Sequence, residues 1–538
     1  TLFNILINEF NSFFMLLLII IFYRFIPNKT LCKKKKNKYI DNVIGLESVK
    51  KDLEQYIDYI ENRKKYKDFG YKIPKGLLFI GPPGTGKTML AREISKKTKS
   101  KFYYHSASDF VELYVGVGAK RIRELFSKAR KQKSAIIFID EIDSIGRKRG
   151  NDTNSERDGT LNSLLVEMDG FNDKDNILVI GSTNFSSILD KALLRSGRFD
   201  RKIIFDKPNI EERKLLFKLY LNKIRLNNDF KNNLDKHLVK LSRLTSNLTG
   251  ADIKNICNQS IGLYLKRINE FKKKLKNGFK ENKYDGATIN DILKSIDEIM
   301  IGMEKKERLM SEEEKKIVSY HEAGHALISY ILKETKPPIK VSIIPRGEIA
   351  LGFSMQEPID KKLFTKNELI SKICVLLGGR ISEEINFGKI TTGASDDIYK
   401  LTKIAYDIVT TYGMSDLIGN INLNREKTSQ YDSIDISESR KKEIDLEVKN
   451  IINECHNFTK NILKKNKIYI KMLAELLFKK EELIYSDFDN LFGNNKIENS
   501  VEIKNIYKND IFEQNYINKT NSESNNINEI EKNNFDDP

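Results

Sequence analysis

The chain has 538 residues, more than one hydrophobic core usually organises, so two or more domains are expected. Its net charge is +18, but the lysines are scattered along amphipathic helices without a basic stripe of stacking aromatics, so no nucleic-acid partner is expected. The four cysteines are widely spaced and form no CxxC pair, so they suggest neither a disulfide framework nor a cysteine-ligated zinc site: Cys32, Cys257, Cys374 and Cys455.

An apolar segment near the N-terminus, at about residues 10–26, predicts a membrane anchor, since about 17 residues is near the lower limit for a spanning helix. A signal-peptide core and a buried core helix are the alternatives. Glu9 and the absence of Lys and Arg before the segment argue against a signal peptide. The lysines at 33–36 and 38 follow directly, which places the rest of the chain on the cytoplasmic, matrix or stromal side. Residues 1–38 are therefore predicted to be a transmembrane helix with a basic juxtamembrane segment, and a lipid bilayer is an expected partner.

A short buried strand at Leu77–Ile80 leads into a predicted phosphate-binding loop. The loop matches GxxxxGK[ST] and consists of Gly81, Pro82, Pro83, Gly84, Thr85, Gly86, Lys87 and Thr88. Its glycines let backbone N–H groups surround phosphates, Lys87 reaches the outer phosphates, and the Thr88 hydroxyl holds Mg²⁺. A chance glycine-rich turn is the alternative, and the strand before and helix after it argue against chance.

Two further apolar runs end in polar side chains. Ile136–Ile139 leads to Asp140 and Glu141, and Ile177–Ile180 leads to Asn184. Ligands bind at the carboxyl ends of parallel strands, so we expect Asp140 to support the metal, Glu141 to polarise the attacking water and Asn184 to orient it. The sequence thus predicts an α/β domain that binds ATP with Mg²⁺.

A glycine-containing loop with one aromatic side chain lies between the first two strands, at Tyr114, Val115 and Gly116. Without further context, a tyrosine packed into the core is the alternative. Arg195 and Arg198 occupy a turn after the third strand, where arginines alone indicate only surface charge.

His321, Glu322 and His325 form an HExxH motif. On a helix, residues i and i+4 share a face, so both imidazoles can bind one zinc ion while Glu322 acts as general base. A structural helix with two satisfied histidines is the alternative. A catalytic zinc needs a third protein ligand, which spacing alone does not select among the many acids.

These motifs, in this order, resemble the FtsH family of membrane-anchored AAA ATP-dependent zinc metalloproteases over roughly Tyr39–Phe492. The resemblance includes the segment 108–118, Leu376–Arg380 and Thr391–Asp397. It implies an α/β plus all-α fold, in which an AAA P-loop α/β domain with a helical lid precedes a mainly helical zinc-peptidase domain. The implied boundaries are 39–207 for the α/β subdomain, 208–304 for the lid, 305–493 for the peptidase and 494–538 for a disordered tail.

The resemblance also implies roles for single residues. Asp397 is the implied third zinc ligand and is favoured over the adjacent Asp396; Glu383 and Glu384 are weaker candidates, expected on the helix surface or beside the ligands. The loop of Tyr114 corresponds to a pore loop that grips substrate. The resemblance implies that Arg195 and Arg198 reach the nucleotide bound to a neighbouring subunit. It also implies that Gly250 and Ala251 lie near the nucleotide bound to their own subunit.

The implied activity is that of an ATP-dependent zinc metalloendopeptidase that unfolds, translocates and degrades membrane and soluble proteins in quality control. It is expected to work as a homo-oligomer, a hexamer, with one Zn²⁺ per subunit. A protease-silent AAA chaperone or membrane-extraction factor is the main alternative, and a nucleic-acid remodelling ATPase is a second. The expected location is an organellar membrane, with plastid-type favoured over mitochondrial, or a bacterial inner membrane.

Overall fold

The computed structural model describes residues 43–492 apart from short stretches at 71–74, 113, 115, 148–154, 171–175, 275–285, 304–309, 347–350, 357–360, 362 and 424–435. The chain divides into two compact units between Asp206 and Lys207. Across the described residues, no helix combines the length and the apolar character needed to cross a membrane. The predicted anchor at 10–26 and the predicted tail at 494–538 lie outside the described residues.

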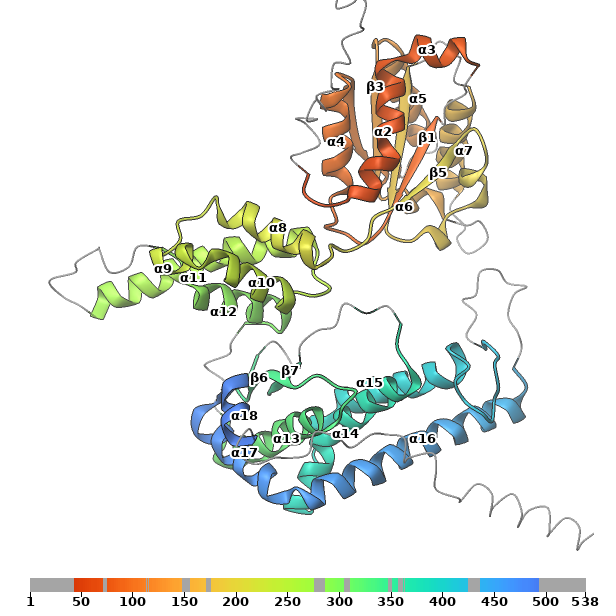
Figure 1. Cartoon of the computed structure of the whole chain (residues 1–538). Helices are drawn as coiled ribbons and strands as arrows, with labels where there is room; N and C mark the ends of the chain where they lie inside the picture. The colour runs from red at the N-terminus through yellow and green to blue at the C-terminus, as the bar shows by residue number, and fades with distance from the viewer. Residues whose placement is uncertain are drawn as a thin grey trace, which may run out of the picture. The chain divides into compact units, whose positions relative to one another are not determined.

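The first unit contains a parallel sheet with helices packed beside it (Figure 1). The sheet has five strands in the order β2-β3-β4-β1-β5, and every adjacent pair of strands is parallel. The strands are β1 (Gly76–Ile80), β2 (Lys101–Ser106), β3 (Ala135–Asp140), β4 (Ile177–Thr183) and β5 (Phe199–Ile204). The three apolar runs of the sequence form its central strands, because a parallel sheet covered on both faces needs near-continuous hydrophobic strands. The predicted strands are extended by one to three residues at their ends.

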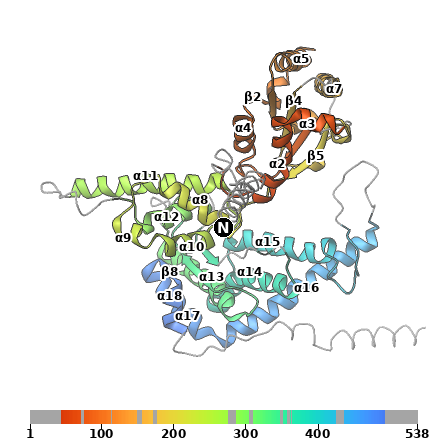
Figure 2. The same ribbon diagram turned by 45° about the horizontal axis from the view of Figure 1, so that its top comes forward.

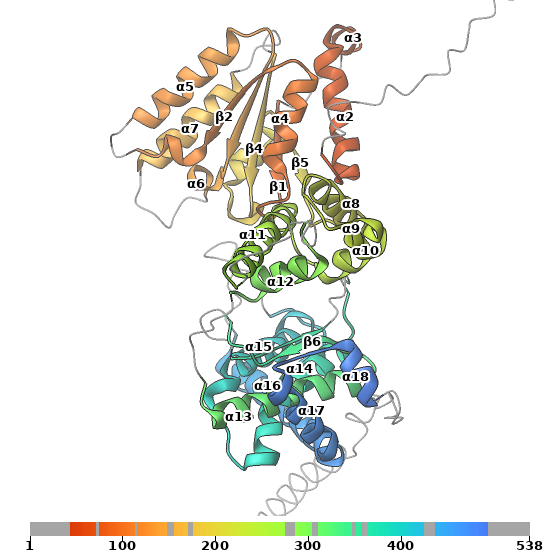
Figure 3. The same cartoon turned by 90° about the vertical axis from the view of Figure 1, so that its left-hand side faces the viewer.

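Helices cover both faces of this sheet (Figure 3). One face packs against α2 (Glu47–Glu61) and α4 (Lys87–Lys97), and the other against α5 (Val117–Arg130) and α7 (Ser155–Asp169). Successive strand residues point to opposite faces, so Ile136 and Phe138 of β3 join the first cluster while Ile137 and Ile139 join the second. Short helices complete the unit: α3 (Arg63–Asp68), α6 (Asp143–Gly146), η2 (Ala107–Phe110), η3 (Ser186–Ile188) and η4 (Lys191–Leu194).

In the described part of the second unit, a group of helices comes first (Figure 2). They are α8 (Ile210–Leu221), α9 (Asn228–Asn232), α10 (Leu234–Leu244), α11 (Gly250–Lys274) and α12 (Ile289–Met300). Asn209 and Glu212 form a capping box that begins α8, and Thr288 and Asp291 do the same for α12. The longest of these helices is α11, which begins at Gly250.

The remainder of the second unit is mainly helical, as predicted. Its helices are α13 (Glu312–Ile331), α14 (Lys366–Phe387), η6 (Thr392–Ala394), α15 (Ser395–Tyr406), η7 (Asp407–Thr411), α16 (Glu438–Lys465), α17 (Lys467–Lys480) and α18 (Tyr485–Phe492). They enclose one hydrophobic cluster, within which α13 packs against both α14 and α17.

A small antiparallel sheet, absent from the sequence prediction, lies beside these helices. Its order is β7-β6-β8, with β6 (Pro338–Ser342) between β7 (Phe353–Gln356) and β8 (Glu482–Ile484). The three strands have only three to five residues each, too few for an alternating pattern to stand out in a sequence. The sheet places Gly352, which precedes β7, against the side chain of Glu322.

Candidate active sites

The Lys87 side chain lies at the carboxyl ends of β1 and β4. Its Nζ donates to the Gly81 carbonyl and to Asn184 Oδ1, the latter at 2.7 Å. Burial lowers the pKa of Lys87, and the nearby carboxylates of Asp140 and Asp143 partly offset this effect. The amine is therefore enclosed by oxygen atoms at the edge where ligands of parallel sheets bind.

The residues expected to hold Mg²⁺ meet at the same edge. Thr88 Oγ1 donates to Asp140 Oδ2 at 3.3 Å, so a hydroxyl and a carboxylate from α4 and β3 lie together. Hydroxyl and carboxylate oxygens are the ligand types that Mg²⁺ prefers. Glu141 follows with φ of 49°, a left-handed conformation that non-glycine residues rarely adopt outside functional turns. The structure thus brings together Lys87, Thr88, Asp140, Glu141 and Asn184.

The rest of the phosphate loop has the backbone shape that such a loop needs. Gly84 and Gly86 have φ of 76° and 96°, and Gly86 directly precedes α4. A Cβ at Gly81 would lie 2.2 Å from the Phe205 carbonyl, so only glycine fits there. Thr85 Oγ1 donates to the Pro82 carbonyl at 2.9 Å and closes the turn that contains Pro83.

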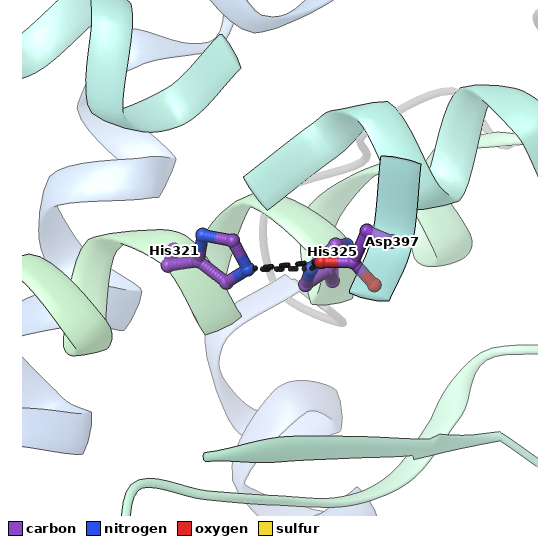
Figure 4. Close-up of side chains that lie close together, drawn as sticks. All are labelled: His321, His325 and Asp397. Carbon is purple, nitrogen blue, oxygen red and sulfur yellow. Dashed lines mark hydrogen bonds and ion pairs between the residues drawn. The ribbon is translucent and has the colours of Figure 1, made fainter. Parts of the chain in front are cut away.

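In the second unit, His321, His325 and Asp397 converge on one point (Figure 4). Both histidines lie on α13 one turn apart, and Asp397 comes from the first turn of α15. The His321 and His325 Nε2 atoms are 3.0 Å apart, and each is 3.3 Å from Asp397 Oδ2. Both histidines are buried, and the Asp397 side chain is 18% exposed.

The other ring nitrogens fix the tautomers of both histidines. His321 Nδ1 lies 2.6 Å from Glu383 Oε1, and His325 Nδ1 lies 2.7 Å from the Val375 carbonyl. Since a carboxylate and a carbonyl only accept hydrogen bonds, each Nδ1 carries a proton, and a ring that has lost its second proton offers its Nε2 lone pair to a metal ion. Two lone pairs and a carboxylate oxygen facing one another need a cation between them.

The size of this triangle fits zinc. Ligand atoms about 2.0–2.2 Å from a tetrahedral zinc lie about 3.3–3.6 Å from one another, and the three separations of 3.0, 3.3 and 3.3 Å lie at or slightly below that range. Two imidazoles and one carboxylate are also a ligand set typical of catalytic zinc, with a further position left for water or substrate. These three residues would hold the ion.

Glu322 lies beside the triangle on the same helix. It is only 6% exposed, and within the described part of the chain its Oε2 has no hydrogen-bond partner. Burial raises the pKa of Glu322, and His325 and His321 partly offset this rise. A buried carboxylate with one unpartnered oxygen, next to a metal site, is suited to accept a proton.

The neighbouring acids have other partners. Asp396 is 62% exposed and pairs with Lys400 at 2.6 Å, away from the triangle. Glu384 pairs with Lys460 at 2.6 Å and with His456 at 3.5 Å. Glu383 is buried and contacts His321, so it orients a predicted ligand.

Two protein-family models match the chain over the regions that hold these sites. Residues 77–207 match the ATPase family associated with various cellular activities (AAA), and residues 308–491 match peptidase family M41. The phosphate loop and the histidine triangle therefore lie within recognised AAA and M41 sequence. The chain belongs to the FtsH family, because it contains both domains and matches proteins named FtsH at 40% identity over most of its length.

Individual FtsH relatives match most of this chain. The mitochondrial ATP-dependent zinc metalloprotease FTSH 3 of Arabidopsis thaliana is 40% identical over 467 residues, which are 86% of this chain and 55% of that protein. FtsH of Rhodothermus marinus is 40% identical over 461 residues, 84% of this chain and 63% of the relative. The mouse mitochondrial inner membrane m-AAA protease component AFG3L2 is 40% identical over 458 residues, 84% of this chain and 55% of the relative. The chain thus spans between about half and two thirds of the length of these relatives.

Two described residues of the predicted pore loop, Tyr114 and Gly116, are exposed. The Tyr114 side chain is 77% exposed, which is contrary to a core position and compatible with a substrate contact. Gly116 has φ of 85° and begins α5 as its N-cap. Val115 lies outside the described residues.

The two predicted arginines differ in their exposure and contacts. Arg195 is exposed at the end of η4, while Arg198 makes a two-pronged ion pair with Asp169, at 3.1 and 2.8 Å, within its own subunit. Gly250 and Ala251 begin α11 in the second unit.

Sequence reasoning missed several residues that shape the FtsH metal site. A Cβ at Gly379 would lie 2.5 Å from both the His321 and His325 Nε2 atoms, and one at Gly352 would lie 2.7 Å from Glu322 Oε1. The Val375 carbonyl that orients His325 was also missed. The double glycine within Leu376–Arg380 was the only sequence pattern that could have indicated these contacts, and it was used only as part of the resemblance to the family.

Proposed function

We propose that this protein is an ATP-dependent zinc metalloendopeptidase that unfolds, translocates and degrades proteins. The observation that carries the proposal is the triangle of His321, His325 and Asp397 beside the buried Glu322, on the same chain as a complete phosphate loop. The two relatives named ATP-dependent zinc metalloproteases, from Arabidopsis thaliana and Rhodothermus marinus, support it.

Each part of the metal site has a chemical task. Zinc, when bound, supplies a Lewis acid that polarises the scissile carbonyl and makes an attacking water more acidic. Glu322 accepts the proton of that water at its carboxylate and returns it to the leaving amine. Glu383 and the Val375 carbonyl hold the imidazoles in the tautomer that leaves Nε2 unprotonated.

The ATPase site supplies work to the peptidase. Lys87 and Thr88 bind ATP and Mg²⁺ with Asp140, Glu141 polarises the attacking water, and Asn184 orients it. Gly250 and Ala251 contribute to the same nucleotide site. Folded substrates need this work, since a folded backbone does not fit into a narrow zinc cleft.

Oligomeric action is part of the proposal. We expect a hexamer in which Arg195 and Arg198 approach the nucleotide of the next subunit, where an arginine stabilises transition-state charge. For Arg198 this requires exchange of its present partner, Asp169. Tyr114, Val115 and Gly116 then contact the substrate in the central pore, where the exposed tyrosine supplies a flat apolar grip.

A membrane location belongs to the proposal as well. The apolar segment at 10–26 supports a bilayer anchor, with the catalytic domains on the cytoplasmic, stromal or matrix side. The relatives include proteins named mitochondrial and a bacterial FtsH, so an organellar or bacterial membrane is the proposed site. Plastid-type over mitochondrial remains a prediction.

The test is degradation of an unfolded protein such as casein, with and without ATP. The wild-type protein is expected to degrade casein only with ATP. Glu322→Gln is expected to stop proteolysis while ATP hydrolysis continues, and Glu141→Gln is expected to stop both. Continued ATP hydrolysis without any proteolysis by the zinc-loaded wild type would favour a protease-silent chaperone.

A further inference from the structure

The loop that carries Tyr114 is fastened at both ends to neighbouring helices. Before the tip, Glu112 pairs with Arg121 of α5 at 2.6 Å, and the same arginine donates to the Asp109 carbonyl at 2.9 Å. After the tip, the Gly116 amide donates to Glu156 Oε2 at 2.9 Å. The contacts of Arg121 before the tip are half-exposed and join residues close in sequence. The Gly116–Glu156 hydrogen bond after the tip joins residues 40 positions apart.

Glu156 is an unusual residue for such a contact because it is buried. It belongs to the first turn of α7 and is only 8% exposed, and its Oε1 has no hydrogen-bond partner among the described residues. Burying a carboxylate is costly unless something stabilises its charge. The Gly116 N–H is therefore a principal partner of a charge that the fold keeps out of water.

Two helix N-termini contribute to that stabilisation, because Glu156 lies in the first turn of α7 and contacts the N-terminus of α5. Gly116 is the N-cap of this 14-residue helix, offers no side chain to cap it, and is followed by no acidic residue in the first turn. The partial positive charge of a helix N-terminus attracts a carboxylate, and here Glu156 of another helix supplies it. Glu156 accepts from the N–H of the N-cap residue, and thus takes the place of the acidic residue that a capping box has at the third helical position.

The two helices are held closely at this end. A Cβ at Gly118 of α5 would lie 2.6 Å from Thr160 Oγ1 of α7, and Ser163 Oγ donates to the Ala119 carbonyl at 3.2 Å. The base of the loop therefore has little freedom to move away from α7. Any displacement of the first turn of α7 acts on the loop through Glu156.

We propose that Glu156 is a positioning residue for substrate translocation. Its hydrogen bond holds the Tyr114 loop at Gly116, so that the loop can transmit force to the substrate. This inference rests on the proposed function of Tyr114. A loop that is released at Gly116 still carries its tyrosine but transmits less force to a folded substrate.

The chain contains no tryptophan, so Tyr114→Trp introduces a single fluorescent reporter at the loop tip. In this background, Glu156→Ala is expected to lower the steady-state anisotropy of the tryptophan. Glu156→Gln is expected to keep it, since the amide oxygen still accepts from the Gly116 N–H. Glu167→Ala is the matched control, because Glu167 joins the opposite ends of α7 and α5 through Arg130 at 2.5 Å, and it is expected to leave the anisotropy unchanged.

Degradation is measured in the native Tyr114 background as peptide bonds cleaved per ATP hydrolysed. For a folded substrate, Glu156→Ala is expected to lower this ratio at least tenfold more than for a short unstructured peptide, with recovery in Glu156→Gln. Unchanged anisotropy and an unchanged ratio in Glu156→Ala would overturn the inference, as would a Gln variant that behaves like Ala. Failure of the proposed function is distinguishable, because then Tyr114→Ala itself leaves degradation of folded substrates intact.

Discussion

Gly324 of α13 and Gly378 of α14 touch backbone to backbone. A Cβ at Gly324 would lie 2.3 Å from the Gly378 carbonyl oxygen, and one at Gly378 would lie 2.8 Å from that of Gly324. The two helices therefore approach more closely than side chains allow. As a result, the next residue, Gly379, lies directly beside the His321 and His325 imidazoles, with no room for a Cβ.

Gly379→Ala is expected to abolish zinc binding, because the new Cβ would lie 2.5 Å from both Nε2 atoms, where the ion belongs. Zinc content per chain, measured by atomic emission after dialysis, checks this. Gly262→Ala in α11 is the control, since a Cβ there meets no atom within 4 Å and alanine favours a helix. A full zinc equivalent in Gly379→Ala would refute the steric role.

The two adjacent aspartates are expected to differ sharply. Asp397→Asn removes a charged oxygen from the triangle and should weaken zinc binding at least 100-fold and stop proteolysis. Asp396→Asn breaks only an exposed pair with Lys400 and should leave both properties within a factor of about two. Competition with a chelator of known affinity measures the difference. The opposite ranking would identify Asp396 as the ligand.

Glu383→Ala is expected to weaken zinc binding by about 10–100-fold, because it removes the acceptor that fixes the His321 ring. Zinc supplied in excess should restore part of the activity. The adjacent Glu384→Ala loses contacts with Lys460 and His456 on the other side of α14, and no change in zinc affinity is expected. Equal effects of the two substitutions would exclude a specific role for Glu383.

Zinc affinity is expected to rise with pH. Burial lowers the pKa of His321, but the Asp397 and Glu383 carboxylates outweigh it and raise the pKa to about 10 in metal-free protein. Below that pH the imidazole holds a proton that zinc must displace, so the apparent affinity should increase by about tenfold per pH unit. Calorimetry in buffers of different ionisation enthalpy should detect the proton released between pH 6.5 and 8.5. An affinity independent of pH across this range would contradict the prediction.

The central strands, the helix α4 after the phosphate loop and the helix α13 with the HExxH motif were predictable, because each has a sequence pattern within one short segment. Continuous apolar runs define β1, β3 and β4, and the residues that follow each run define the nucleotide edge. The HExxH spacing likewise predicts two imidazoles on one face of α13. In each of these cases one short segment contains the whole pattern.

The rest of the metal site depends on contacts between distant segments. Spacing could not distinguish Asp397 from other acids, because its position depends on how α15 packs near α13; the family pattern supplied that choice. The Val375 carbonyl has no side-chain signal at all, and the short strands β6, β7 and β8 carry too little pattern to be seen. No sequence pattern pointed to Glu156 either, because its proposed role depends on its burial and on its contact with Gly116.

The most direct test of the zinc site is X-ray absorption at the zinc edge of the purified wild-type protein. We predict one zinc per chain, with two imidazole nitrogens and carboxylate or water oxygens at about 2.0–2.2 Å, and loss of this signal in Asp397→Asn. Protein without bound zinc, or sulfur scattering at about 2.3 Å, would contradict the account.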